Sequence, residues 1–254
     1  MISVITVTKN DTTRLTSTIK SLANYFKLKN FQHIVVHGGV INDSEKKLIK
    51  SHKKIELVYE NDSGIYDAMN KGINRCLMEY VLFLNCGDRL LMPPRILKII
   101  LNKSKKNNII CLPYIQEWSS RSIKKTPTSP KKNILPTSHQ AMLFKNEFIK
   151  RNLYDTTYKI AADFDLYLKS DFSKIQIVKN CKPLTIVEGD GVASINSYKA
   201  YNEYIKIVFH KYGLIKGFTS ITKILVKSLL VRSAKKIISK NAMVKIRSIC
   251  NTKN

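Results

Sequence analysis

The order of strand-like and helix-like stretches in the N-terminal half is the feature that most constrains the fold. Runs rich in β-branched or apolar residues, typical of buried strands, occur at residues 2–8, 33–39, 55–60, 80–85 and 108–115. Stretches with capping residues and helical spacing of apolar side chains lie between them. Strands that alternate with helices form a mainly parallel sheet covered on both faces. The sequence therefore predicts an α/β fold.

The residues that follow the predicted strands are the candidates for a functional site, because ligands of such sheets bind beyond the carboxyl ends of the strands. These residues lie at positions 8–11, 37–39, 60–64 and 85–88. The motifs of several other enzyme classes are absent, including the P-loop, the dinucleotide-binding glycine pattern and the zinc-protease H-E-x-x-H. Three polar clusters therefore remain to be considered.

The first cluster is Asn85-Cys86-Gly87-Asp88, directly after the apolar strand. A carboxylate at the end of a rigid strand can hold a hard divalent cation, and a glycine beside it lets the backbone approach a ligand. Mg²⁺ is typically bound by one or two carboxylates together with substrate phosphates. The alternative is a turn in which Asp88 only caps the backbone.

The second cluster runs from Glu60 to Gly72 at a predicted junction between a loop and a helix. Asp62 and Asp67 bring two carboxylates to this junction, and Lys71 lies one turn into the helix. The four-residue spacing of Asp67 and Lys71 also suits a simple ion pair on one helix face. Because a helix start directs its amide groups at anions, we favour a binding site.

The third cluster combines His139 with Asp163 and Asp165. The two aspartates are two residues apart on a predicted helix, so only one of them faces a given pocket. A carboxylate beside a substrate hydroxyl is a plausible general base. The alternatives are that Asp163 caps the helix and that His139 is structural.

Taken together, these clusters resemble the family-2 glycosyltransferases of the GT-A fold, and among them bacterial enzymes of surface-polysaccharide assembly. The resemblance covers residues 1–170 fairly continuously and is most specific in DSGIYDAMNKGI followed by FLNCGD. It implies a nucleotide-diphosphate-sugar donor, a Mg²⁺ or Mn²⁺ cofactor, and inverting transfer to a hydroxyl of a saccharide acceptor that is lipid-linked.

The resemblance also implies roles for individual residues. Asp88 matches the metal-binding carboxylate and Asp163 matches the general base. The residues that match donor or acceptor contacts are Thr8, Asn10, His37, Asp62, Asp67, Lys71, Asn85 and His139.

The sequence departs from the family pattern after the second strand. His37 stands where the family has an aspartate that contacts the nucleotide base, and Val40 and Asn42 replace a serine and a second aspartate. Asn85 also replaces the first carboxylate of a D-x-D motif. The His37 departure implies either altered base recognition or a degenerate, non-catalytic subunit.

The charge distribution sets residues 211–254 apart from the catalytic domain predicted at residues 1–210. The chain has a formal net charge of +26, yet all 18 acidic residues precede residue 211, and the tail carries 11 lysines and arginines. Its apolar and basic residues fit two short helices with a bend better than one amphipathic helix. We expect this basic extension to contact the anionic inner membrane surface; the alternative is packing on the catalytic domain.

The remaining sequence features favour a cytoplasmic, peripherally membrane-bound protein. The apolar start predicts a strand rather than a signal peptide, and no run of 18 apolar residues is present. The five cysteines form no C-x-x-C pair, which argues against a disulfide scaffold or zinc finger. The net charge leaves a nucleic-acid-binding module as an alternative function, but no motif of that class occurs, so no nucleic-acid partner is expected.

Overall fold

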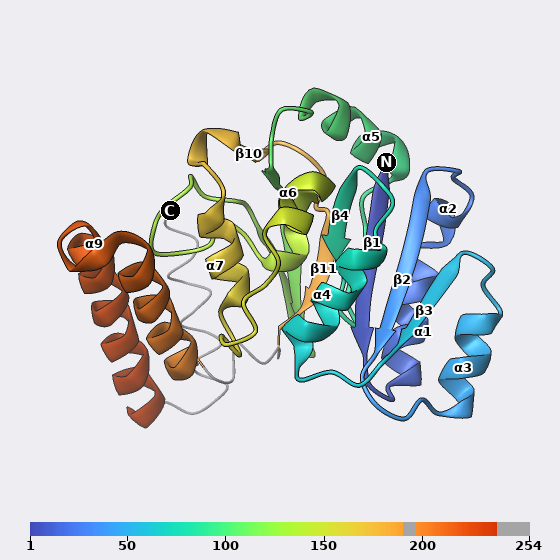
Figure 1. The fold of residues 1–254 in the computed structure, drawn as a ribbon, viewed down its shortest axis with the longest axis horizontal. Helices are drawn as coiled ribbons and strands as arrows, with labels where there is room; N and C mark the ends of the chain where they lie inside the picture. Colours follow the sequence, from blue (N-terminus) through green and yellow to red (C-terminus); the bar gives the residue numbers. More distant parts are fainter. Residues whose placement is uncertain (190–196, 238–254) are drawn as a thin grey trace. The chain divides into compact units, whose positions relative to one another are not determined.

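The computed structural model describes residues 1–189 and 197–237 of the chain (Figure 1). The chain divides into two compact units, and each is described by itself. The first unit comprises residues 1–131 and 135–189. The second comprises residues 132–134 and, among the residues described, 197–237.

A seven-stranded sheet forms the centre of the first unit, in the order β10-β6-β9-β4-β1-β2-β3. Strand β1 pairs in parallel with β2 and β4, β2 with β3, and β6 with β10, whereas β9 runs antiparallel between β4 and β6. The mainly parallel sheet predicted from the sequence is therefore confirmed. The strands are β1 (Ile2–Thr8), β2 (Phe31–His37), β3 (Ile55–Tyr59), β4 (Tyr80–Phe83), β6 (Ile109–Cys111), β9 (Met142–Lys145) and β10 (Ile175–Ile177).

Helices cover both faces of this sheet. Val35 of β2 packs with Leu15 of α1 and Ile49 of α3 on one face. On the other face, Gly72 of α4 lies so close to Ile5 and Val36 that a Cβ there would be 2.7 Å from the Ile5 side chain. The helices are α1 (Thr12–Ser21), α2 (Ala23–Phe26), α3 (Asp43–Lys50), α4 (Ile65–Arg75), α5 (Pro94–Lys103), α6 (Asn146–Arg151) and α7 (Ala162–Lys169), with 3₁₀ turns η1 (His139–Ala141) and η2 (Phe172–Lys174).

A second sheet of four strands follows the order β5-β11-β7-β8. It corrects one expectation from the sequence. The single strand expected at residues 108–115 is divided around Pro113, which has no amide hydrogen for a ladder, and continues in this second sheet. Residues 121–125 form a further strand, which pairs antiparallel with residues 114–118. The strands are β5 (Arg89–Leu90), β7 (Tyr114–Trp118), β8 (Arg121–Lys125) and β11 (Thr185–Glu188).

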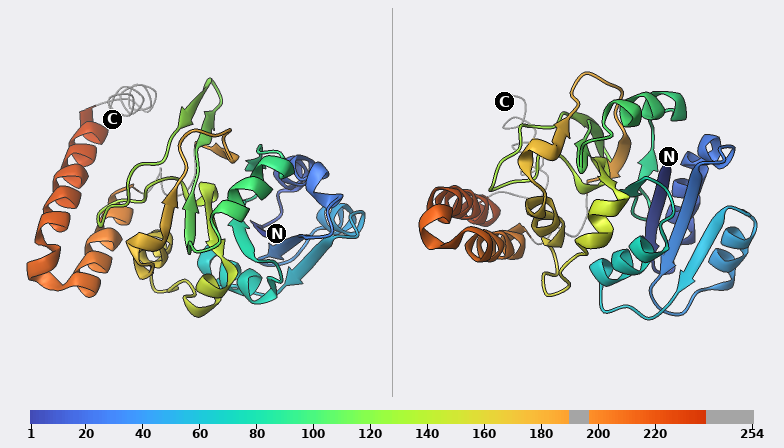
Figure 2. Two further views of the ribbon diagram at one scale, coloured as in Figure 1. Left: turned by 90° about the horizontal axis from the view of Figure 1, so that it is seen from above. Right: turned by 45° about the horizontal axis from the view of Figure 1, so that its top comes forward.

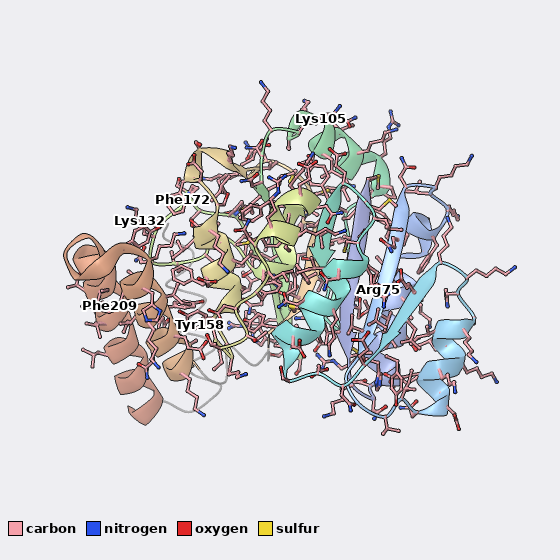
Figure 3. All side chains as sticks on the ribbon, in the orientation of Figure 1. Arg75, Lys105, Lys132, Tyr158, Phe172 and Phe209 are labelled. Carbon is pink, nitrogen blue, oxygen red and sulfur yellow. The ribbon has the colours of Figure 1, made fainter. Side chains whose placement is uncertain are left out.

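In the second unit, helix α9 (Ser197–Ile237) bends at Gly213, which has a φ of 69°. Figure 2 shows the two arms of α9 on either side of this bend. The Lys132 ammonium group lies 4.6 Å from the ring centroid of Tyr212, just before the bend (Figure 3). The helix begins before the boundary expected at residues 210 and 211, and residues 238–254 of the expected extension lie outside the described residues. Within the described ranges, no helix is long and apolar enough to cross a membrane.

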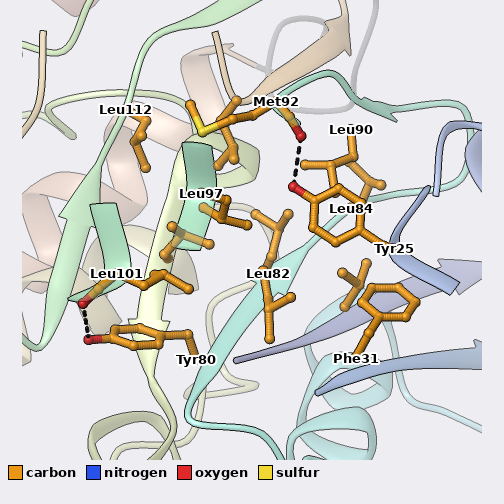
Figure 4. Packing of buried hydrophobic residues seen from close by; sticks show 14 of the residues in the cluster. Tyr25, Phe31, Tyr80, Leu82, Leu84, Leu90, Met92, Leu97, Leu101 and Leu112 are labelled. Carbon is orange, nitrogen blue, oxygen red and sulfur yellow. Dashed lines mark hydrogen bonds between the residues drawn. The ribbon is translucent and has the colours of Figure 1, made fainter. Parts of the chain in front are cut away.

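Buried aliphatic and aromatic side chains fill the core on one side of β4 and β1 (Figure 4). The hydroxyl groups of its tyrosines find backbone acceptors: Tyr25 donates to Met92 O at 2.7 Å, and Tyr80 donates to Leu101 O at 3.4 Å. Because both phenols are satisfied, they can be buried at no cost in lost hydrogen bonds. This packing holds β1 and β4 rigidly, so that the polar residues after them start from a fixed position.

Candidate active site

Asp88 lies in a tight turn that follows β4. Its amide donates to Asn85 O at 2.9 Å, and Gly87 in the same turn has a φ of 100°, a conformation that favours glycine. The Asp88 side chain is 4% exposed, and its Oδ1 accepts from the Glu188 amide at 3.1 Å. Burial, followed by the nearby negative charge of Glu188, raises the pKa of Asp88 to about 7. The Asp88 side chain is therefore tied to β11 through the Glu188 amide.

Asn85 precedes Asp88 in the same turn, and its Oδ1 is buried with no hydrogen-bond partner among the residues that the structure describes. A buried oxygen of this kind is costly unless something binds it. Together with the Asp88 carboxyl, it fits a hard cation that takes one or two oxygens from the protein and the rest from substrate phosphates. No group of three or more His, Cys, Asp or Glu side chains that could hold a metal occurs in the part of the chain that the structure describes.

Arg14 and Glu188 form an ion pair over this turn, and sequence reasoning missed both residues. A Cβ on Gly87 would lie 2.5 Å from Glu188 Oε1 and 2.6 Å from Arg14 Nε. Both side chains are about half exposed, Arg14 at 50% and Glu188 at 42%. Glu188 is 100 residues from Asp88 in the sequence, so no local pattern could have revealed the contact.

The loop after β1 is joined to the end of β2. Asn10 has a positive φ of 53°, its Nδ2 donates to Val40 O at 2.8 Å, and its Oδ1 accepts from the Asn42 amide at 3.2 Å. Thr8 is buried, and its hydroxyl donates to Glu45 at 3.2 Å. His37 is fully buried against Glu45, with 2.9 Å between Nε2 and Oε2. His37 therefore exposes no atom to a ligand in this structure, and Glu45 is a further residue that the sequence analysis missed.

Asp67 and Lys71 lie in the first two turns of α4, and Asp62 lies in the loop just before this helix. The Asp62 carboxylate lies directly against Gly38, where a Cβ would be only 2.0 Å from Oδ2. Asp67 accepts from the Ser63 amide at 2.9 Å, a bond that lowers the pKa of this carboxyl. Lys71 pairs with Asp67 at 3.4 Å. The ion pair considered from the sequence is thus present, close to the end of β2.

Asp163 lies in the first turn of α7 and is connected to α4. Its Oδ1 accepts from the Phe164 amide at 2.8 Å and lies 3.4 Å from the Tyr66 hydroxyl. Asp165, by contrast, pairs with Lys169 at 2.8 Å. Asp163 thus contacts α4, whereas Asp165 pairs with a lysine of its own helix.

His139 is buried beneath the same region. Its ring stacks on Phe83 with 4.8 Å between centroids, and its Nε2 contacts the Tyr154 hydroxyl. Burial lowers the pKa of His139 to about 3, so the ring is neutral at physiological pH. The Tyr154 ring packs in turn against Tyr66 at 5.2 Å. His139 is thus linked to the Asp163 region through two tyrosines rather than by direct contact.

The mainly parallel sheet, with its polar clusters beyond the carboxyl ends of β1, β2 and β4, defines an α/β enzyme of the GT-A glycosyltransferase type. Solved structures of similar fold include residues 1–349 of TarS from S. aureus in complex with UDP, with 14% identity and a TM-score of 0.69 over 95% of this chain and 76% of that one. Another is the mannosyltransferase PcManGT from Pyrobaculum calidifontis in complex with GDP-Man and Mn²⁺, with 12% identity and a TM-score of 0.57 over 98% of this chain and 79% of that one.

Sequence comparison gives the family. The family model of glycosyl transferase family 2 matches residues 3–175, and the chain belongs to this family. Two curated relatives, each described as an uncharacterized glycosyltransferase, come from the CDC 1551 and H37Rv strains of Mycobacterium tuberculosis. Each is 28% identical over 200 residues, which cover 73% of this chain and 71% of the relative. The protein is therefore a glycosyltransferase, and the nucleic-acid-binding module loses its support.

Proposed function

We propose that the protein transfers a sugar from a nucleotide-diphosphate donor to a hydroxyl of a saccharide acceptor, with a divalent cation and with inversion at the anomeric carbon. The observation that carries the proposal is the turn after β4, which holds the buried Asp88 and an Asn85 side-chain oxygen that is buried without a hydrogen-bond partner among the described residues. The complexes of similar fold point the same way, since TarS is seen with UDP and UDP-GlcNAc, and PcManGT with GDP-Man and Mn²⁺.

Asp88 would hold the cation, and Asn85 would offer its oxygen to the cation or to a donor hydroxyl. A Mg²⁺ or Mn²⁺ ion bound there supplies positive charge to the departing diphosphate. Thr8, Asn10, Asp62, Asp67 and Lys71 form the remainder of the proposed donor site, around the ends of β1 and β2.

Asp163 is the proposed general base. It takes the proton of the acceptor hydroxyl while that oxygen bonds to the anomeric carbon, and the bond from this carbon to the diphosphate breaks. A single displacement of this kind inverts the configuration and releases a nucleoside diphosphate. The Phe164 amide and the Tyr66 hydroxyl, which approach Asp163 Oδ1, support the role by orienting the carboxylate.

We further propose that the acceptor is lipid-linked and that the enzyme works at the membrane in surface-polysaccharide assembly. The support is the basic composition of residues 211–254 together with exposed apolar side chains on α9, namely Leu225, Val226 and Leu229. Such a surface suits contact with anionic lipid, because basic groups approach the headgroups while apolar groups enter the interface.

The first experiment is thermal unfolding of the purified protein with UDP, GDP, CDP or dTDP, each with and without Mn²⁺. A ligand at about 100 times its dissociation constant adds about 2.7 kcal/mol to the free energy of unfolding. We expect one nucleotide to stabilise the protein only when Mn²⁺ is present, and the Asp88→Ala variant to lose this effect. Unchanged metal dependence in Asp88→Ala would place the cation elsewhere, and no stabilisation of the wild type would contradict the proposal.

A further inference from the structure

Glu45 and His37 form a pair that is shielded from solvent beneath the proposed donor site. His37 Nε2 lies 2.9 Å from Glu45 Oε2, and both side chains are completely buried. His37 Nδ1 lies 3.1 Å from Gly39 O, which can only accept, so Nδ1 donates. Both ring nitrogens of His37 therefore have protein partners, which fix the orientation of the ring.

This pair supports the loop after β1 through three contacts. Glu45 Oε1 accepts from the Thr8 hydroxyl at 3.2 Å and from the Asp11 amide at 2.9 Å. The Asn10 amide faces His37 Nε2 at 3.4 Å, a longer contact with the same nitrogen that lies 2.9 Å from Glu45 Oε2. Because Asn10 has a positive φ of 53°, uncommon for a residue with a side chain, its conformation depends on such external support.

We propose that Glu45 and His37 are positioning residues for donor binding. They do not touch the nucleotide; they hold Thr8, Asn10 and Asp11 in the conformation that binds it. This inference rests on the proposed function, since it takes residues 8–11 as part of the donor site. The burial of this pair also explains why His37, the last residue of β2, lies beside the proposed donor site without contacting the donor.

The test compares nucleotide dissociation constants, measured by calorimetry in the presence of Mn²⁺, for the nucleotide that stabilises the wild type. Glu45→Ala removes the carboxylate contacts to Thr8, Asp11 and His37. We expect the nucleotide dissociation constant of this variant to rise about tenfold, which is the rise that results when about a tenth of the molecules are competent to bind. Glu45→Gln can still accept from Thr8 and Asp11 and can donate to His37 Nε2. We expect this variant to bind within about threefold of the wild type.

Ser3→Ala is the matched control. Ser3 and Gln32 form a buried side-chain hydrogen bond of 2.8 Å between the same two strands, β1 and β2, at their opposite ends. Its Oγ also accepts a backbone amide, that of Met78, at 3.1 Å. The control should lower the unfolding temperature and leave the nucleotide dissociation constant unchanged, which separates positioning from general loss of stability.

Equal weakening in Ser3→Ala, or wild-type affinity in Glu45→Ala, would overturn the inference while leaving the proposed function intact. If the wild type binds no nucleotide, the proposed function fails and this inference fails with it. Should Glu45→Ala not fold, His37→Asn provides the same test. It keeps Glu45 with Thr8 and Asp11 but shortens the side chain that receives the Asn10 amide, and unchanged affinity in this variant would also overturn the inference.

Discussion

The hydroxyl of Tyr66 on α4 lies 3.4 Å from Oδ1 of Asp163 at the start of α7, and the same hydroxyl donates to Ile160 O at 2.7 Å. One tyrosine thus fixes the backbone before α7 and approaches the proposed base. Helix α4 therefore connects the proposed donor-site residues Asp67 and Lys71 to the proposed base on α7.

Replacing Asp163 by asparagine should abolish sugar transfer and leave nucleotide binding nearly unchanged. The amide keeps the shape of the carboxylate but cannot take the proton of the acceptor hydroxyl, and general-base catalysis typically contributes about 10²- to 10⁴-fold. The transfer rate is measured by single-turnover kinetics and the nucleotide affinity by calorimetry, both on the same preparation. Loss of nucleotide binding would show that Asp163 belongs to the donor site, and Asp165→Asn serves as the neighbouring control.

Tyr66→Phe should reduce transfer less than Asp163→Asn does. It removes a hydroxyl that bonds the Ile160 carbonyl, which typically lowers the free energy of unfolding by about 1 kcal/mol. The transfer rate at saturating donor should fall, because the Asp163 carboxylate loses an orienting contact. A normal rate together with reduced stability would assign Tyr66 a purely structural role.

The metal-free protein should lose stability as the pH rises towards 7 because of Asp88. The pKa of this carboxyl is about 7 in the folded protein, whereas an aspartate in an unfolded chain has a pKa of 3.8. The stabilisation that protonated Asp88 gives to the folded protein is therefore fully present below about pH 4. It is lost as the pH rises through 7, because the buried carboxyl must then ionise. The unfolding temperature of the wild type should therefore fall relative to that of Asp88→Asn as the pH is raised from about 4 to 8. A pH-independent difference would contradict the assignment.

Gly87→Ala should destabilise the protein more than Gly64→Ala. Both glycines have positive φ angles, 100° and 140°, so each substitution strains the backbone by about 1–3 kcal/mol. Only at Gly87 would the new Cβ meet the Arg14 and Glu188 side chains, whereas at Gly64 no atom of the described residues lies within 4 Å of it. Chemical denaturation of the two variants measures the difference. Equal losses of stability in the two variants would mean that the Arg14 and Glu188 side chains move away from the new Cβ at no cost.

Basic residues of the tail should determine binding to anionic vesicles. Each lysine or arginine near such a surface contributes about 1 kcal/mol, so five glutamine substitutions should abolish co-sedimentation at moderate salt. Those substitutions are at Lys223, Lys227, Arg232, Lys235 and Lys236. A charge-matched control carries glutamine at Lys46, Lys47, Lys50, Lys53 and Lys98. Similar loss in the control would point to net charge rather than to the tail.

The architecture was predictable from the sequence wherever local pattern determines structure. Strands buried on both faces have continuous runs of apolar or β-branched residues, and β1, β2 and β4 lie where such runs occur. The pattern failed around Pro113, because a short apolar run does not say to which of two sheets each half belongs. It failed again at β8, because the sequence RSIKK has a single apolar residue, which is too weak a pattern to indicate a strand.

The site was predictable in part, for a similar reason. Asp67 and Lys71 are four residues apart on one helix, so their ion pair follows from spacing. Glu188 reaches Asp88 from a segment 100 residues away, and Glu45 reaches Thr8 from a segment 37 residues away, so only the folded chain brings these partners together. The position of His37 at the end of β2 was predictable, but its burial was not, because the carboxylate that covers it comes from α3.

The antiparallel strand β9 divides the binding edge into two halves that are each continuous in the sequence. Because β9 reverses direction, its amino end, preceded by His139, lies beside the carboxyl end of β4. The proposed donor contacts are confined to residues 8–88, whereas the proposed acceptor-side residues begin at His139. The two sets of proposed contacts thus come from separate stretches of the chain, and the Tyr66–Asp163 contact between α4 and α7 joins them.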